Sequence, residues 1–203
     1  MNRAKSQRRF VFACLAPAVI LVALFMFWPT VNVFRMSLYR MGGITNRKEF
    51  IGLQNFKTLM EDKNFLEAMQ NTILIIVMVM IFTIVFAILF AAILQRGKFK
   101  GKNFFRVIFY IPNILSIVVI GGIFGAIYDP SNGLLNTFLE AVHLDFLTHK
   151  WMGEPKIVIY SIIFALVWQA IGYYMVMYMS GMSAIPEDLY EAASLDGSSE
   201  INT

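Results

Sequence analysis

Six uncharged polar and aromatic side chains lie inside apolar stretches of the sequence, where they could bind a polar ligand. They are Asn113, Ser116, Trp168, Gln169, Tyr173 and Tyr174. Aromatic faces beside an amide suit a sugar, because a sugar ring has apolar C–H faces and polar edges. The alternative is that these residues serve hydrogen bonding and close packing between neighbouring helices. The sequence leaves both interpretations open.

The closing stretch, IPEDLYEAASLDGSSEINT, holds five acidic residues and no basic one. Pro186 suits the first position of a helix, and acidic residues in the first turn favour the helix dipole. Gly197 suits a left-handed helix end. The pattern therefore predicts a short helix over Pro186–Asp196. Such a helix could lie at the membrane interface against its own protein, or it could dock through alanines into the basic groove of a partner.

The other chemistry-bearing residues form no recognisable catalytic or metal site. His143 and His149 lack the spacing of a metal pair, and the single cysteine, Cys14, excludes an internal disulfide. The sequence also lacks the glycine-rich loop with lysine that binds nucleotide phosphates. We therefore expect no catalytic residue, no bound metal, no cofactor and no enzymatic activity in this chain.

The composition indicates a protein whose solvent is lipid. The 203 residues are 58% hydrophobic and 15% charged, and the mean hydropathy is +0.65. Four stretches without a charged residue are long enough to cross a bilayer: Phe10–Trp28, Ile73–Leu94, Val107–Tyr128 and Ile157–Met179. The expected fold is an all-α polytopic bundle with four transmembrane helices and short interfacial helices, the latter near Leu53–Met60 and Leu134–Val142.

Basic residues predict the orientation. The tail 1–9 holds four Lys or Arg residues and the short loop 95–106 holds five, and such clusters favour the cytoplasmic side. Both ends of the sequence are therefore expected in the cytoplasm, with 29–72 as an external segment that contains short helices. The basic excess is interpreted as topology, and no nucleic acid partner is expected.

Four motifs occur in the order found in one transporter family. The stretch GMSAIPEDLYEAASLDG resembles the EAA motif of binding-protein-dependent ABC importer permeases, in the sugar-permease branch of maltose and glycerol-3-phosphate type importers. FIGLQNFKTLMEDKNFLEAMQNT, GKNFFRVIFYIP and GLLN resemble the segments that precede it in that branch. The resemblance covers nearly the whole chain from Phe50 onward.

The resemblance implies a permease that moves a sugar or related solute by alternating access in the bacterial cytoplasmic membrane. Its partners would be an ATP-binding ABC subunit, a second permease forming a heterodimer and an extracytoplasmic solute-binding protein. ATP would be bound by the ATPase subunit. The acidic helix would be the coupling helix, with the ATPase-coupling residues Leu189, Tyr190, Glu191, Ala192, Ala193, Asp196 and Gly197.

The family pattern also implies that residues 73–203 are an incomplete ABC type-1 transmembrane domain. Its spans would be 73–94, 107–128 and 157–179, with the coupling loop at 181–203. The pattern continues beyond the glycine, so we expect two further spans in the complete protein. The alternatives are an ion-coupled secondary transporter and a membrane anchor without transport activity. An ion-coupled carrier usually has a charge near the middle of a span, which these stretches lack.

Overall fold

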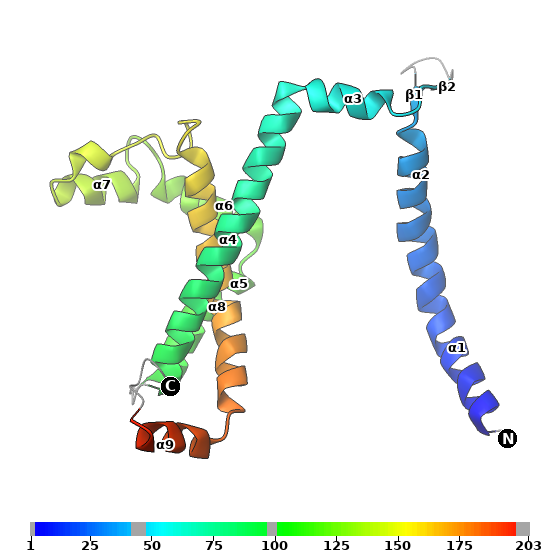
Figure 1. Cartoon of the computed structure of the whole chain (residues 1–203). Coiled ribbons are helices and arrows are strands. Elements are labelled where there is room, and N and C mark those ends of the chain that lie inside the picture. The colour runs from blue at the N-terminus through cyan, green and yellow to red at the C-terminus, as the bar shows by residue number, and fades with distance from the viewer. Residues whose placement is uncertain (1–2, 42–47, 97–100, 198–203) are drawn as a thin grey trace. The chain divides into compact units, whose positions relative to one another are not determined.

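A computed structural model describes residues 3–41, 48–96 and 101–197. The chain divides into two compact units, Met1–Met69 and Gln70–Thr203. Figure 1 shows that helices dominate both units. Within the described residues, three helices are long and apolar enough to cross a membrane: Gln7–Met36, Lys63–Gln95 and Val158–Ser183. The expected all-α membrane fold is therefore confirmed.

The first unit begins with one continuous helical rod. It consists of α1 (Arg3–Val22), a π-helical turn η1 (Ala23–Phe27) and α2 (Trp28–Met36). The predicted span 10–28 lies inside this rod, which continues because helical hydrogen bonding does not stop where the apolar run ends. Two polar side chains bond to their own helix beyond that point: Thr30 Oγ1 donates to Met26 O at 2.7 Å and Asn32 Nδ2 donates to Trp28 O at 3.1 Å.

The rest of the first unit contains a small hairpin and a helix. Strands β1 (Tyr39–Met41) and β2 (Lys48–Phe50) pair antiparallel, with Arg40 opposite Glu49. This hairpin was not predicted, because strands of three residues are too short to show an alternation of apolar and polar residues. Helix α3 (Gln54–Glu61) follows. Asp62 then caps α4 (Lys63–Arg96), since its Oδ1 accepts from Asn64 N at 2.9 Å. The helix that begins at this cap continues into the second predicted span.

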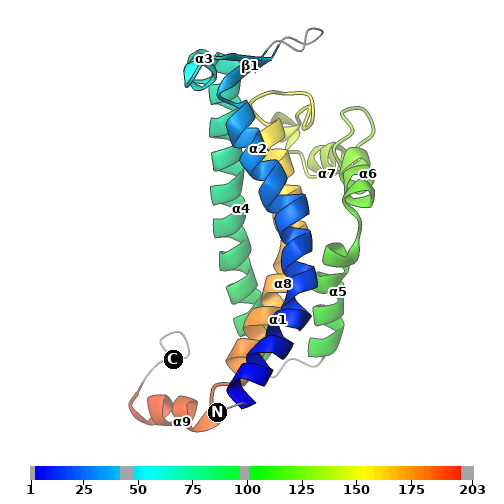
Figure 2. The same ribbon diagram turned by 90° about the vertical axis from the view of Figure 1, so that its right-hand side faces the viewer.

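The second unit is a bundle built on α4, α5 (Lys102–Ile114) and α8 (Val158–Ser183). One end of it carries α6 (Ile117–Ile127), α7 (Leu134–Ala141) and the 3-10 turn η2 (Asp145–Leu147). The other end carries α9 (Glu187–Leu195). In both views, α9 lies at the opposite end of α8 from α7 (Figures 1 and 2).

The predicted third span, 107–128, is broken rather than continuous. Helices α5 and α6 are bent by 102° at Leu115 and Ser116, both of which have extended backbone. Pro112 lacks an N–H and weakens the last turn of α5. Ser116 then begins α6, because its Oγ accepts from Val119 N at 3.4 Å. The described residues therefore contain three continuous candidate spans, or four if the bent pair counts as one.

Two apolar clusters hold this bundle together. One joins α4 and α8 through buried Ala87, Ala91, Leu94, Met175 and Met179, with Phe105 and Phe109 of α5 packed against it. The other surrounds Ile120, Phe124 and Tyr128 near the α7 end. The backbones of α5 and α8 also touch directly, since a Cβ built on Gly172 would lie 1.8 Å from Phe109 O. Only a glycine permits this approach.

Candidate functional site

Helix α9 is the candidate docking element. It turns away from the axis of α8 and runs across its end (Figures 1 and 2). The observed bounds, Glu187–Leu195, lie one residue inside the predicted ones at each end. Pro186 therefore precedes the first turn, and its carbonyl accepts from Leu189 N at 3.2 Å. Proline suits this place because it has no N–H that would need a partner.

The far end of α9 closes as its sequence predicts. Asp196 N donates to Ala192 O at 3.0 Å, and Gly197 has a φ of +80°. This left-handed conformation is the one expected for a glycine that ends a helix. The chain therefore turns sharply after Leu195. A side chain at position 197 would strain that turn.

The described surface of α9 is acidic and apolar. Leu189 is 61% exposed and Leu195 is 89% exposed. Asp188, Ala192 and Asp196 are exposed as well, whereas Ala193 is half-buried. Tyr190 and Glu191 belong to the helix, but their side chains lie outside the described part of the structure. Exposed leucines among carboxylates and small residues are suited to an apolar groove with basic edges.

The candidate ligand-path residues fall into two groups. Gly172, where the two backbones touch, lies between Gln169 and Tyr173 on α8, and Asn113 follows Phe109 by one turn on α5. Gln169 and Asn113 are half-buried, and the ring of Tyr173 meets that of Tyr174 edge-on at 5.3 Å. These residues thus flank one helix crossing.

The remaining two candidates have partners within the protein. Ser116 caps α6 through the hydrogen bond to Val119 N. Trp168 packs edge-on against Phe124, with ring centroids 5.4 Å apart. Packing between helices, the role of Trp168, is one that the sequence left open beside ligand binding, whereas the cap formed by Ser116 was not predicted. Sequence spacing alone could not separate packing from ligand binding, because Trp168 and Phe124 are distant in the chain.

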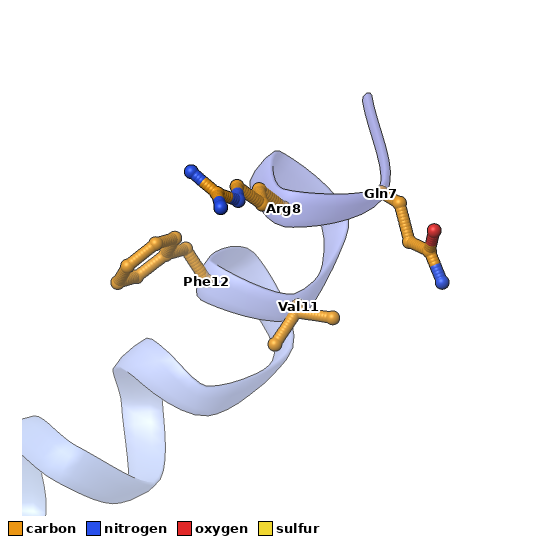
Figure 3. Close-up of a pocket in the computed structure, with 4 residues that line it drawn as sticks. All are labelled: Gln7, Arg8, Val11 and Phe12. Carbon is orange, nitrogen blue, oxygen red and sulfur yellow. The ribbon is translucent and has the colours of Figure 1, made fainter. Parts of the chain in front are cut away.

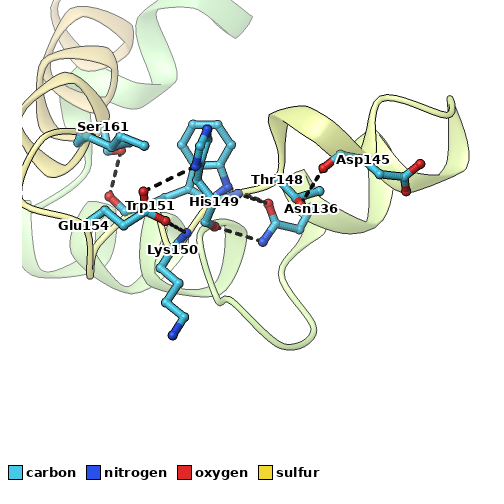
Figure 4. Close-up of polar contacts among 9 residues, drawn as sticks. Asn136, Asp145, Thr148, His149, Lys150, Trp151, Glu154 and Ser161 are labelled. Atoms are coloured by element: carbon cyan, nitrogen blue, oxygen red, sulfur yellow. Dashed lines mark hydrogen bonds and ion pairs between the residues drawn. The ribbon is translucent and has the colours of Figure 1, made fainter.

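The bundle end that carries α7 is organised by a polar network (Figure 4). Asn136 is 8% exposed; its Oδ1 accepts from Trp151 Nε1 at 2.7 Å and its Nδ2 donates to His149 O at 3.1 Å. Ser161 Oγ on α8 donates to Trp151 O at 2.9 Å. The network therefore fastens the loop after η2 to both α7 and α8. His149 Nδ1 also lies 3.3 Å from Glu154 Oε2.

The turn between α6 and α7 is held by a carboxylate. Asp129 Oδ1 accepts from Asn132 N at 2.8 Å and from Ser131 N at 2.9 Å. These two backbone N–H groups, that of Asn132 first, hold the pKa of Asp129 below its usual value. The turn is also tight, since a Cβ on Gly133 would lie 2.2 Å from Asp129 O.

Two hollows on the described surface are shallow and open. One is lined by Gln7, Arg8, Val11 and Phe12, which are adjacent side chains of α1 alone (Figure 3). Another, of about 440 Å³, is lined by Asn103, Arg106, Val107, Tyr110, Ile111, Ile114 and Val176. Neither encloses a ligand. The described residues also contain no group of His, Cys, Asp or Glu that could hold a metal ion.

The family of this chain follows from a comparison with known proteins. Residues 83–203, more than half of the chain, match the family described as binding-protein-dependent transport system inner membrane component. The chain belongs to this family. The matched region begins in α4 and includes the broken helix pair, α8 and α9. The family is one of transport components and not of catalysts, and the apolar helices make this member an integral membrane protein.

Individual relatives agree with the family. The probable ABC transporter permease protein YurN of Bacillus subtilis is 36% identical over 92% of this chain and 64% of its own length. The diacetylchitobiose uptake system permease protein NgcF of Streptomyces coelicolor is 29% identical over 96% of this chain and 58% of its own. The chain thus spans less than two thirds of the length of these relatives.

The fold also matches a solved transporter. The crystal structure of a bacterial ABC transporter involved in the import of the acidic polysaccharide alginate superposes with a TM-score of 0.82 at 24% identity. The match covers 100% of this chain and 68% of the other. At this identity the likeness establishes the fold alone. The second unit therefore has the fold found in that transporter.

Proposed function

We propose that this chain is the permease subunit of an ABC importer and carries a carbohydrate or related solute across the bacterial cytoplasmic membrane. The main support for this proposal is α9, an acidic helix with exposed leucines that lies across the end of α8. It falls within residues 83–203, which match the family. It is the coupling helix of the transporter. Its residues Leu189, Tyr190, Glu191, Ala192, Ala193, Asp196 and Gly197 form the contact with the ATPase.

The ATPase is a separate subunit that binds and hydrolyses ATP, and this chain has no enzymatic activity of its own. Leu189 and Leu195 are exposed on α9, and so is Asp196 directly after it. A helix docking in a groove with basic edges buries the leucines and pairs the carboxylates. A second permease, different from this one, completes the membrane pathway.

The end with α7 faces outward and receives the solute-binding protein, and the end with α9 faces the cytoplasm. Lys and Arg near residues 95–106 support this orientation, because that loop joins the α9 ends of α4 and α5. One related transporter, for alginate, was solved in complex with a pentasaccharide-bound periplasmic protein. That complex supports a solute-binding protein as a partner here.

The solute is a carbohydrate or a close relative of one. Relatives of the chain are described as permeases for diacetylchitobiose, lactose and multiple sugars. The solute passes close to the α5–α8 crossing, where Asn113, Gln169 and Tyr173 flank Gly172. An amide and aromatic rings at one crossing offer both hydrogen bonds and stacking surfaces to a sugar.

The test uses the complete transporter, with Glu191→Ala as the main variant. Loss of one member of a desolvated charge pair costs about 2–5 kcal/mol, so retention of the ATPase in detergent pull-downs should fall at least about tenfold. Uptake into proteoliposomes should be lost with it. Gly197→Val should have the same effect, because a β-branched residue resists the +80° φ of this position.

Asp188→Asn is the matched control, since Asp188 is an exposed carboxylate on the same helix and is absent from the coupling set. It should retain both the ATPase and uptake. If Glu191→Ala and Gly197→Val behaved like this control, α9 would be a helix that only packs on its own protein. The coupling function would then be wrong.

A further inference from the structure

A polar contact joins three helices at the end of the bundle that carries α9. Gln95 lies near the end of α4, Lys102 begins α5 and Ser183 ends α8. Gln95 Nε2 donates to Ser183 Oγ at 2.9 Å, and Lys102 Nζ donates to Gln95 O at 2.9 Å. We call these three residues the latch. They come from positions up to 88 residues apart in the chain.

The Ser183 hydroxyl makes two hydrogen bonds in the latch. It accepts from Gln95 Nε2 at 2.9 Å and donates to Met179 O at 2.8 Å, so the two bonds run in the same direction from α4 into α8. Gln95 O is one of the last carbonyls of α4 and has no partner within its helix. The Lys102 ammonium supplies that partner and places a cation at the negative end of the helix dipole.

An apolar cluster lies directly beside the latch. Met179, whose carbonyl accepts from Ser183, is buried against Ala91 and Leu94 of α4. Phe105 of α5 packs against the same cluster, one turn after Lys102. The ends of α4, α5 and α8 are thus held together both by side-chain packing and by directed hydrogen bonds.

The connection from the latch to α9 is short and stiff. Three residues separate Ser183 from the first residue of α9. Ala184 N donates to Gly181 O at 3.1 Å and Ile185 N donates to Met182 O at 3.2 Å, while the ring of Pro186 fixes its own φ. A movement of α9 must therefore move the end of α8, because the link has little freedom to absorb it.

We propose that Gln95 and Ser183 are positioning residues of the transport cycle. The latch makes the ends of α4, α5 and α8 move as one body when α9 is displaced. Without it, the end of α8 follows α9 while α4 lags behind, and part of the displacement is lost. This inference rests on the proposed coupling role of α9, and it concerns residues outside the docking helix itself.

The test compares uptake and ATP hydrolysis by the complete transporter in proteoliposomes. Ser183→Ala and Gln95→Ala should each lower the maximal uptake rate about two- to twelvefold, the effect of one net hydrogen bond. The KM for the solute-loaded binding protein should stay unchanged. ATP hydrolysis should fall less than uptake, so fewer solute molecules are moved per ATP. The maximal uptake rate of the double variant should be no lower than that of the single variant with the lower rate.

Two further variants separate positioning from general stability. Ser183→Thr keeps the hydroxyl and should restore uptake to near the parental rate. Ser180→Ala removes an exposed hydroxyl from the same turn of α8 and should change neither uptake nor the ratio of solute to ATP. Additive losses in the double variant, or equal falls in uptake and hydrolysis together with a lowered Tm, would overturn the latch.

The outcome for Glu191→Ala distinguishes this inference from the proposed function. If Glu191→Ala abolishes uptake while Ser183→Ala and Gln95→Ala leave it intact, α9 couples the subunits and the latch is wrong. If Glu191→Ala leaves ATPase retention and uptake intact, the coupling role of α9 is wrong, and the latch, which depends on it, is overturned too.

Discussion

Replacing Gly172 by alanine should separate α5 from α8. The added methyl carbon would lie 1.8 Å from Phe109 O, 2.4 Å from Phe109 C and 2.9 Å from Tyr110 Cα. Ordinary contacts begin near 3.4 Å. All three atoms belong to the backbone, so no change of a side-chain rotamer can relieve the overlap. Either α5 must shift away as a whole or the helix must deform locally.

The size of the effect follows from this geometry. Overpacking usually costs about 1–3 kcal/mol, and a clash with backbone belongs at the upper end or beyond. Gly172→Ala would otherwise raise helix propensity by about 1 kcal/mol, so the net loss should be at least about 2 kcal/mol. The assay is the fraction of detergent-solubilised full-length protein that remains monodisperse after heating, which gives an apparent Tm.

Gly181→Ala provides the matched control on the same helix. A Cβ at Gly181 meets no described atom within 4 Å, so this variant gains helix propensity without a clash. Its apparent Tm should equal or exceed that of the parent, whereas that of Gly172→Ala should be clearly lower. Equal Tm values for the two variants would refute the close backbone contact between α5 and α8.

Two further predictions concern the solute path and the polar network. Gln169→Ala should lower the affinity of the complete transporter for its solute several-fold, since a positioned hydrogen bond is worth about 0.5–1.5 kcal/mol, and unchanged uptake kinetics at normal expression would instead support a packing role. Asn136→Leu should lower the apparent Tm by the equivalent of about 1–3 kcal/mol, because it leaves Trp151 Nε1 and His149 O without their partner. Thr137→Val, an equally polar-to-apolar change on α7 with an exposed side chain, is the control and should leave the Tm nearly unchanged.

The spans and helix α9 could be predicted from the sequence, because their causes are local. A run of some twenty uncharged apolar residues can be satisfied in lipid only as a helix, whatever surrounds it. The end of α9 could be predicted as well, because the left-handed conformation of Gly197 depends only on the residue type and its immediate neighbours. The EAA motif gave the family for the same reason: it is a contiguous stretch.

Helix lengths were harder, because hydropathy marks only the part of a helix that lipid surrounds. Helix α4 begins ten residues before the predicted span, because Asp62 caps its first turn there. The bend of 102° after Ile114 was not predicted, although Pro112 lies just before it in the sequence. A proline weakens a helix, but whether the chain then kinks slightly or turns by a right angle depends on what packs against each half.

Composition, apolar periodicity and capping residues by themselves determined that this chain is a helical membrane protein with an acidic helix near residue 190. Tertiary structure alone decided which helices touch. Gly172 looks like any other glycine in the sequence until the backbone of Phe109 lies against it. Gln95 and Ser183 are unremarkable polar residues until the ends of α4 and α8 meet. The physical reason is that such contacts depend on the distance between segments remote in the chain, and local preference carries no information about that distance.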